Sequence, residues 1–201
     1  MTVRFDTMLI EALYREGVIL FGDFRLTSGA WSPYYIDLRK VISRPRLFKR
    51  VVSHYIAALD MIEGFDVISG IETGSIPVAS VVSYILDYPM IYVRKKRKEA
   101  GAGKVIEGSL NPGSRVVILE DVTTTGGSIL RAVEAIRSIG GVVEYAVTFI
   151  DRMQGAVKNL AEADVELLPI YRVKDIVEVL HSSGLLEDDR YAVVMEYIGG
   201  I

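Results

Sequence analysis

A short apolar segment that ends abruptly at two carboxylates constrains the fold of this chain more than any other feature. Residues 115–128 read RVVILEDVTTTGGS, in which an aliphatic run over 116–119 is followed at once by Glu120 and Asp121. Four β-branched and aliphatic residues bounded by charge predict a strand that is buried on both faces. The polar, glycine-rich turn after it precedes an amphipathic stretch that starts at Ile129. It therefore predicts an anion-binding loop at a helix N-terminus.

Strand and helix patterns alternate through the rest of the chain. A first helix over 3–16 and a hairpin within 17–39 precede a helix that starts near Pro45. Further strands are predicted at 66–71, 90–93, 142–150 and 164–171. Further helices are predicted at 76–86, 129–139, 153–162, 173–182 and 188–198. This alternation predicts an α/β fold, with a mostly parallel sheet flanked by helices on both faces and ligands at the carboxyl ends of the strands.

Composition narrows the class of protein. The chain of 201 residues is long enough for one domain, and with half its residues hydrophobic it can bury a sizeable core. A net charge of −3 gives no general attraction to nucleic acid or membranes. The absence of cysteine and the presence of only two histidines exclude thiolate metal sites and disfavour a zinc site. With no signal pattern and no long apolar run, we expect a cytoplasmic protein.

The loop after the central strand has the groups that a ribose 5-phosphate needs. Backbone N–H groups and hydroxyls over 123–128 can bind a phosphate, and Gly126 and Gly127 let the backbone approach it closely. Because carboxylates repel phosphate, Glu120 and Asp121 suit the neighbouring ribose diol, or a metal ion. The alternative is an ordinary strand-to-helix turn capped by Ser or Thr.

A run of five basic residues, RKKRK at 94–98, follows the strand predicted at 90–93 and enters a long polar loop that ends near Pro112. Basic runs are usually a solvated face or a nucleic-acid patch. Long loops inside compact domains, however, often act as lids. A cationic lid suits a reaction whose leaving group is pyrophosphate, because it neutralises the charge that develops.

Two further segments suggest the second substrate. The adjacent Tyr34 and Tyr35, within FRLTSGAWSPYYIDLR at 24–39, could line a flat heteroaromatic ring or simply pack on the core. Arg152 follows the strand predicted at 142–150 and offers a planar fork for a carboxylate. A surface ion pair between Arg152 and Asp151 is the alternative. The turn GIETGSIP at 70–77 offers backbone N–H groups to a pyrophosphate.

Together these motifs resemble the type I phosphoribosyltransferases, and among them the orotate phosphoribosyltransferases. The stretch 115–128 resembles the binding motif for phosphoribosyl diphosphate (PRPP), 94–108 the catalytic loop, and Leu-x-Ser-Gly-x-x-Ser-Pro-Tyr from Leu26 the N-terminal signature. The resemblance implies a type I phosphoribosyltransferase fold in a single domain, 1–201. A small N-terminal hood mainly in 1–40 would carry acceptor-binding elements, and a core of about 41–201 would bind PRPP.

The resemblance also implies roles for individual residues. The residues expected to bind PRPP are Thr73, Gly74, Arg94, Lys95, Lys98, Glu120, Asp121, Val122, Thr123, Thr124, Thr125, Gly126, Gly127 and Ser128. Those expected to bind orotate are Thr27, Tyr34, Tyr35, Thr124 and Arg152. Of these, Lys98, Glu120 and Asp121 are expected to be catalytic. The chain departs from the family pattern at Ala100, where the loop carries a histidine, and at Thr27, where many members carry a lysine.

The implied reaction transfers 5-phosphoribosyl from PRPP to orotate, giving orotidine 5′-phosphate and pyrophosphate in pyrimidine (UMP) biosynthesis. The implied cofactor is Mg²⁺, bound mainly through PRPP and not by a dedicated protein cage. The implied assembly is a homodimer whose lid loop is shared across the interface, with no nucleic-acid or membrane partner. Two alternatives stay open: a phosphoribosyltransferase for another base, and a non-catalytic PRPP-binding regulator.

Overall fold

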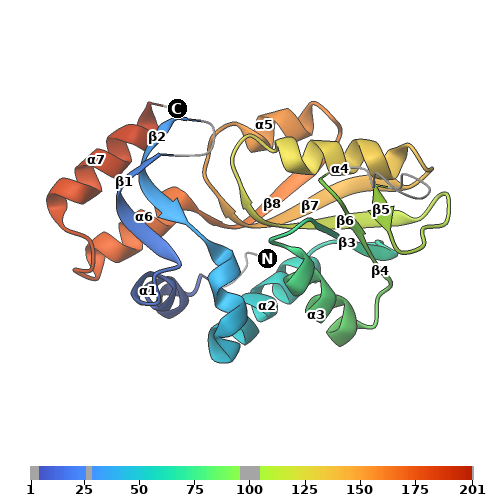
Figure 1. The fold of residues 1–201 in the computed structure, drawn as a ribbon, viewed down its shortest axis with the longest axis horizontal. Coiled ribbons are helices and arrows are strands. Elements are labelled where there is room, and N and C mark those ends of the chain that lie inside the picture. The colour runs from blue at the N-terminus through green and yellow to red at the C-terminus, as the bar shows by residue number, and fades with distance from the viewer. Residues whose placement is uncertain (1–4, 26–28, 96–104, 201) are drawn as a thin grey trace.

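The structure is a computed structural model that describes residues 5–25, 29–95 and 105–200. A six-stranded sheet in the order β5-β4-β3-β6-β7-β8 forms its centre (Figure 1). Five strands are parallel: β3 (Val67–Ile71), β4 (Met90–Val93), β6 (Arg115–Thr123), β7 (Val142–Asp151) and β8 (Glu166–Arg172). The short β5 (Ile106–Glu107) pairs with β4 in the antiparallel sense. The predicted mostly parallel α/β sheet is therefore confirmed.

Helices cover both faces of this sheet, so its central strands are buried on both sides. Helices α2 (Pro45–Leu59) and α3 (Ile76–Leu86) lie on one face, and α4 (Gly127–Arg137) and α5 (Ala156–Ala161) on the other (Figure 1). Because side chains alternate along a strand, Val117 and Leu119 of β6 enter the core with α2 and α3. Ile118 enters the other core, with α4 and α5.

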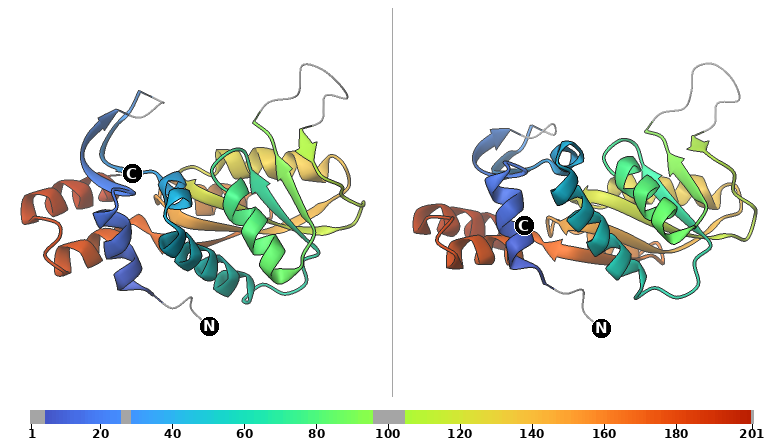
Figure 2. Two further views of the ribbon diagram at one scale, coloured as in Figure 1. Left: turned by 60° about the horizontal axis from the view of Figure 1, so that its bottom comes forward. Right: turned by 90° about the horizontal axis from the view of Figure 1, so that it is seen from below.

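An antiparallel hairpin lies at one end of the sheet. It consists of β1 (Ile19–Arg25) and β2 (Trp31–Ile36), preceded by α1 (Thr7–Arg15) and followed by a 3-10 helix, η1 (Leu38–Ser43). The C-terminal helices α6 (Val173–Ser182) and α7 (Asp188–Gly199) lie at the same end (Figure 2). Their contact is direct, because the rings of Tyr34 in β2 and Tyr197 in α7 meet edge to face at 5.9 Å.

Several elements differ from the sequence prediction. Strand β6 continues through both acids to Thr123, because its ladder with β7 runs on to the pair Thr123–Asp151. Polar side chains here mark the site and not the end of the strand. The loop expected over 95–112 contains β5, the helix expected over 153–162 is only α5, and η1 was not predicted. Among the described residues, no helix is long and apolar enough to cross a membrane.

Candidate active site

The connections that follow β3, β4, β6 and β7 all leave the sheet at its carboxyl edge, because these strands are parallel. The chain after β3 passes into α3 on one face, whereas the chain after β6 passes into α4 on the other (Figure 1). Such a divergence between neighbouring strands opens a crevice in which ligands of α/β proteins bind. The turn after β3, the acid pair with its loop, and Arg152 therefore lie at one edge of the sheet.

The two acids of the central strand are held in different ways. Glu120 is buried, and one of its carboxylate oxygens accepts a hydrogen bond of 2.6 Å from the Ser128 hydroxyl. Its backbone carbonyl accepts a second bond of 2.6 Å from the hydroxyl of Tyr55, a fully buried residue of α2. Asp121 is half-buried, and its carboxylate accepts a bond from the backbone N–H of Val122. The acids are thus positioned from both faces of the sheet.

Burial changes the protonation of this pair. It raises the pKa of Glu120 to about 8, and the neighbouring Asp121 carboxylate adds to the effect. Burial thus favours the protonated form of Glu120 in the absence of ligand, whereas a bound cation would favour the carboxylate. Burial, and then Asp121, also raise the pKa of Tyr55, so that its hydroxyl stays a donor to Glu120.

The turn after β3 touches the acid pair directly. A Cβ placed on Gly74 would lie 2.0 Å from Oδ2 of Asp121, which is far inside van der Waals contact. Glycine is thus required here by the close approach of the carboxylate. Ser75 fixes the turn, since its buried hydroxyl accepts from the backbone N–H of Ile71 at 2.7 Å. Gly74 consequently lies beside Asp121, and the expected contact of Thr73 and Gly74 with pyrophosphate stays a prediction.

The loop over 123–128 has the geometry of an anion site. Gly126 caps α4 with φ of 82°, and neither a side-chain cap nor an acidic residue lies in the first turn of this helix. Asn159 of α5 donates to the carbonyl of Thr125 at 2.9 Å and holds the loop. The buried hydroxyl of Thr123 has no hydrogen-bond partner among the residues that the structure describes. The alternative of a Ser or Thr cap is therefore wrong, because Ser128 bonds to Glu120 instead.

Arg152 connects this edge of the sheet to the hairpin. Its backbone N–H donates to the carbonyl of Thr123, and its guanidinium is buried. Nη2 donates to the Ser32 hydroxyl at 3.0 Å, Nε donates to the Tyr34 hydroxyl at 3.3 Å, and the group lies 4.7 Å above the Tyr34 ring. No carboxylate of the described chain forms an ion pair with it, so the proposed surface pair with Asp151 is wrong. The Asp151 carboxylate instead accepts from the backbone N–H of Met153.

The two adjacent tyrosines point to opposite faces of β2, as alternation in a strand requires. Tyr34 is fully buried under Arg152, and burial raises the pKa of its hydroxyl. Tyr35 is half-buried on the other side, with its ring 5.7 Å from that of Phe24. The expectation that both line one ring pocket stays a prediction, and it applies more directly to Tyr34.

The basic run begins where β4 ends. Arg94 pairs with Glu107 of β5 at 3.2 Å, and the backbone N–H of Lys95 donates to the Glu72 carboxylate at 2.8 Å. These contacts join the start of the basic run to the turn that holds Gly74. Lys98, Ala100 and Thr27 lie outside the described residues.

Two site residues were not predicted from the sequence. Tyr55 belongs to the apolar stripe of a helix, and its periodicity indicates a core residue without showing its bond to Glu120. Ser32 looks like a turn residue before a proline, yet it is buried and joins Arg152 to the backbone carbonyl of Tyr34 at 2.7 Å. The Ser-Pro-Tyr sequence was the available signal for Ser32, whereas no local signal marks Tyr55.

The class of protein follows from comparison with known families. The phosphoribosyl transferase domain family matches residues 41–184, which include the acid pair, the anion-binding loop and Arg152. The chain therefore belongs to the phosphoribosyltransferase family, and the resemblance inferred from the motifs is confirmed.

Particular relatives make the comparison more specific. An orotate phosphoribosyltransferase of Sulfolobus acidocaldarius is 40% identical over 191 residues, which cover 94% of this chain and 95% of that protein. The orotate phosphoribosyltransferase of Methanocaldococcus jannaschii is 46% identical, covering 84% and 94% of the two chains. The crystal structure of orotate phosphoribosyltransferase from Aeropyrum pernix has a TM-score of 0.75 at 33% identity and covers 87% of this chain and 99% of that one.

A longer protein also contains this fold. Leishmania donovani UMP synthase has a TM-score of 0.87 at 31% identity over 97% of this chain, and this match spans 42% of that protein. The predicted type I phosphoribosyltransferase fold is thus confirmed over nearly the whole chain, including the hairpin and the C-terminal helices.

Proposed function

We propose that this protein transfers the 5-phosphoribosyl group of PRPP to orotate, giving orotidine 5′-phosphate and pyrophosphate for UMP synthesis. The observation that carries the proposal is Arg152, a buried guanidinium without an ion-pair partner among the described residues. An unpaired buried charge is costly, so the site favours a ligand that brings a carboxylate. Orotate differs from uracil by one carboxylate, and the orotate phosphoribosyltransferase relatives support this choice.

The donor side accounts for the other half of the reaction. The N–H groups over 123–128 bind the 5-phosphate, and Glu120 and Asp121 bind the ribose hydroxyls. As pyrophosphate leaves, positive charge develops at C1, and these two acids stabilise it more strongly than the neutral ground state. Thr124, at the start of the loop, and Arg152 orient the orotate ring. Thr73 and Gly74 contact the leaving group, and Lys98 stabilises its charge.

The donor set fits Mg²⁺ only as part of a shared site. Among the described residues, no group of three or more Asp, Glu or His side chains could hold a metal ion. Glu120 and Asp121 supply two carboxylates, which suits an ion whose other oxygen ligands come from the substrate and water. Mg²⁺ bound in this way would neutralise the departing pyrophosphate.

A spectrophotometric assay tests the proposal. Orotate consumption is followed with PRPP and Mg²⁺, with uracil and hypoxanthine as competing acceptors and EDTA as the metal control. We expect turnover of orotate alone, and only with Mg²⁺. Equal turnover of uracil would remove the role given to Arg152. Turnover of hypoxanthine alone would favour a purine enzyme, and PRPP binding without turnover would favour a regulator.

The assembly we propose is a homodimer that packs through α3. This helix reads IPVASVVSYIL, yet only Val78, Ala79 and Val82 are buried, while Tyr84 and Ile85 are 87% and 54% exposed. A helix that is apolar all round normally has a second partner. Because α3 begins at the turn that holds Gly74, a second copy on this surface would lie beside the active site. A location in the cytoplasm completes the proposal, since a substrate with three phosphates does not cross membranes unaided.

Light scattering of wild type and of Tyr84→Glu tests this surface. We expect a dimer for the wild type and a monomer for the variant, with Val193→Glu, on the exposed side of α7, as the matched control. A dimeric Tyr84→Glu variant would contradict the α3 interface. For a shared lid, mixing Lys98→Ala chains with Asp121→Asn chains should restore part of the activity. Verified mixed dimers that stay inactive would argue against sharing.

A further inference from the structure

Arg131 lies on the helix that begins at the anion-binding loop and has no role so far. It is four residues after Gly127 in α4, so both occupy one face of the helix. Long helical side chains point back towards the N-terminus. Accordingly, Nη1 of Arg131 lies 3.5 Å from the position that a Cβ on Gly127 would take, and the Thr125 hydroxyl lies 3.8 Å from the same position. The guanidinium thus covers the first turn of α4.

This is an unusual place for a cation. The N-terminus of a helix is already positive, and acidic side chains normally favour it. The first turn of α4 has no acidic residue and no side-chain cap. Within the described parts of the chain, no carboxylate pairs with Arg131. Arg131 is exposed, so water solvates its charge in the absence of a ligand, and an anion at the helix terminus would interact with both positive groups.

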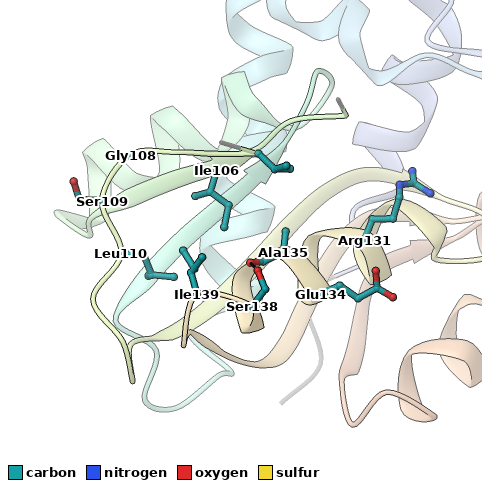
Figure 3. A pocket seen from close by; sticks show the side chains of 10 residues that line it. Ile106, Gly108, Ser109, Leu110, Arg131, Glu134, Ala135, Ser138 and Ile139 are labelled. Atoms are coloured by element: carbon teal, nitrogen blue, oxygen red, sulfur yellow. Dashed lines mark hydrogen bonds between the residues drawn. The ribbon is translucent and has the colours of Figure 1, made fainter. Parts of the chain in front are cut away.

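On its other side, Arg131 has no hydrogen-bond or ion-pair partner among the residues that the structure describes. It lines one end of a cavity of about 720 Å³, whose remaining wall includes Ile106, Leu110 and Ile139. Figure 3 shows Arg131 at the end of this cavity away from Leu110, next to Glu134. Glu134 and Arg131 approach from α4 but form no ion pair within the described chain. The guanidinium is consequently free to engage a ligand at the loop.

We propose that Arg131 is a further binding residue for the 5-phosphate of the ribose. The backbone N–H groups over 123–128 bind the phosphate along the axis of α4, and Arg131 adds charge-assisted hydrogen bonds from the side of Gly127. Because Gly127 has no side chain, the guanidinium can reach past it. The inference rests on the proposed function for the identity of the whole donor, but not for the binding of a sugar phosphate.

Binding of ribose 5-phosphate, measured by calorimetry, tests the role without catalysis. We expect Arg131→Met to weaken binding about 10-fold and Arg131→Lys by less, since lysine keeps the charge but loses the planar fork. Arg15→Met, which removes an exposed helical arginine on α1, is the matched control and should bind as the wild type does. Both substitutions at Arg131 keep an unbranched aliphatic stem, and thermal unfolding checks that each variant is folded.

Steady-state kinetics give the second readout. The 5-phosphate does not react, so we expect the loss of one of its contacts to act mainly on the binding of PRPP. Arg131→Met should therefore raise KM for PRPP about 10-fold, with kcat and KM for orotate unchanged.

Three outcomes would overturn the inference: wild type that does not bind ribose 5-phosphate, Arg131→Met that binds it normally, or equal losses in Arg131→Met and Arg15→Met. If ribose 5-phosphate binding depends on Arg131 but orotate is not turned over, the inference stands and the proposed function fails.

Discussion

The donor side of the site is built around one stretch of chain, residues 120–128, with the turn at Gly74 against it, whereas the acceptor side joins residues about 120 positions apart. On the donor side, Ser128 reaches Glu120 eight residues earlier, and the loop follows directly from the strand. On the acceptor side, Arg152 after β7 meets Ser32 and Tyr34 of the hairpin, at sequence separations of 120 and 118. Local geometry thus sets where PRPP binds, whereas docking of the hairpin sets which acceptor follows.

This difference has a consequence for mutation. Substitutions on the donor side should alter PRPP binding without disturbing orotate, and substitutions at the hairpin contact should do the reverse. A variant that weakened the binding of both substrates equally would show that the donor and acceptor sides are energetically coupled.

The largest effect is expected at Arg152. Arg152→Met removes the buried charge that would pair with the carboxylate of orotate, and hydrogen bonds to charged groups contribute roughly 1.5–3 kcal/mol. We expect kcat/KM for orotate to fall about 100-fold with little change in KM for PRPP. Initial rates at varied concentrations of each substrate check this. An equal loss of kcat/KM for orotate and for PRPP would contradict the separation of the donor and acceptor sides.

On the donor side, Gly74→Ala is the sharpest test. The added Cβ would lie 2.0 Å from Oδ2 of Asp121, so either the turn or the carboxylate must move. A displacement of about 1 Å in a catalytic group can cost on the order of 100-fold in rate, and we expect a loss of tens of fold in kcat/KM for PRPP. Gly113→Ala, at a glycine with open space around it, is the control for a surface glycine. Gly113 has a φ of 86°, so an alanine there would strain the backbone without touching any other atom.

Ser32→Ala should give a smaller change on the acceptor side. The Ser32 hydroxyl accepts a hydrogen bond from Nη2 of Arg152 at 3.0 Å, so we expect it to position the guanidinium and not to bind orotate itself. The loss of one such hydrogen bond costs about 1 kcal/mol of binding free energy. We therefore expect KM for orotate to rise about fivefold while kcat is unchanged. Ser32→Thr keeps the hydroxyl and should recover most of the affinity. A change in kcat alone would argue for a structural effect on the hairpin.

The sequence predicted the donor side better than the acceptor side, for a physical reason. The signals for β6, for the anion-binding loop and for α4 are local, because burial, φ of Gly126 and helix periodicity depend on neighbouring residues. The meeting of Arg152 with Ser32 depends on long-range packing, which no local pattern contains. The resemblance to a family assigned Arg152 and Tyr34 to one ligand, but neither it nor the residues predicted the contact with Ser32.

Tyr34 and Tyr35 show, within one strand, what the sequence alone does not predict. Composition makes the two residues equivalent, but alternation in β2 separates them, so that only Tyr34 lies under Arg152. Tyr55 is a second case. Its position in an apolar stripe correctly predicts burial in α2, yet its hydroxyl contacts the carbonyl of Glu120, 65 residues away.

The last prediction concerns stability and not catalysis, and it tests the protonation of Glu120, the buried acid of the donor side. Burial, with a contribution from Asp121, raises the pKa of Glu120 from 4.5 to about 8 in the folded protein. Between these two values the folded state binds a proton that the unfolded state lacks, so stability falls as pH rises. Glu120→Gln cannot ionise and escapes this loss.

The melting temperature of Glu120→Gln relative to wild type should therefore increase from pH 5 to pH 8 and then level off. The gain should grow steadily over this range, because the folded wild type loses there the proton that stabilises it. Thermal unfolding of the ligand-free proteins at pH 5, 6.5, 8 and 9 measures it, with Glu178→Gln on the exposed side of α6 as the control. A constant offset across this range would mean that Glu120 is ionised throughout. In that case the acid pair would meet the ribose hydroxyls as two hydrogen-bond acceptors.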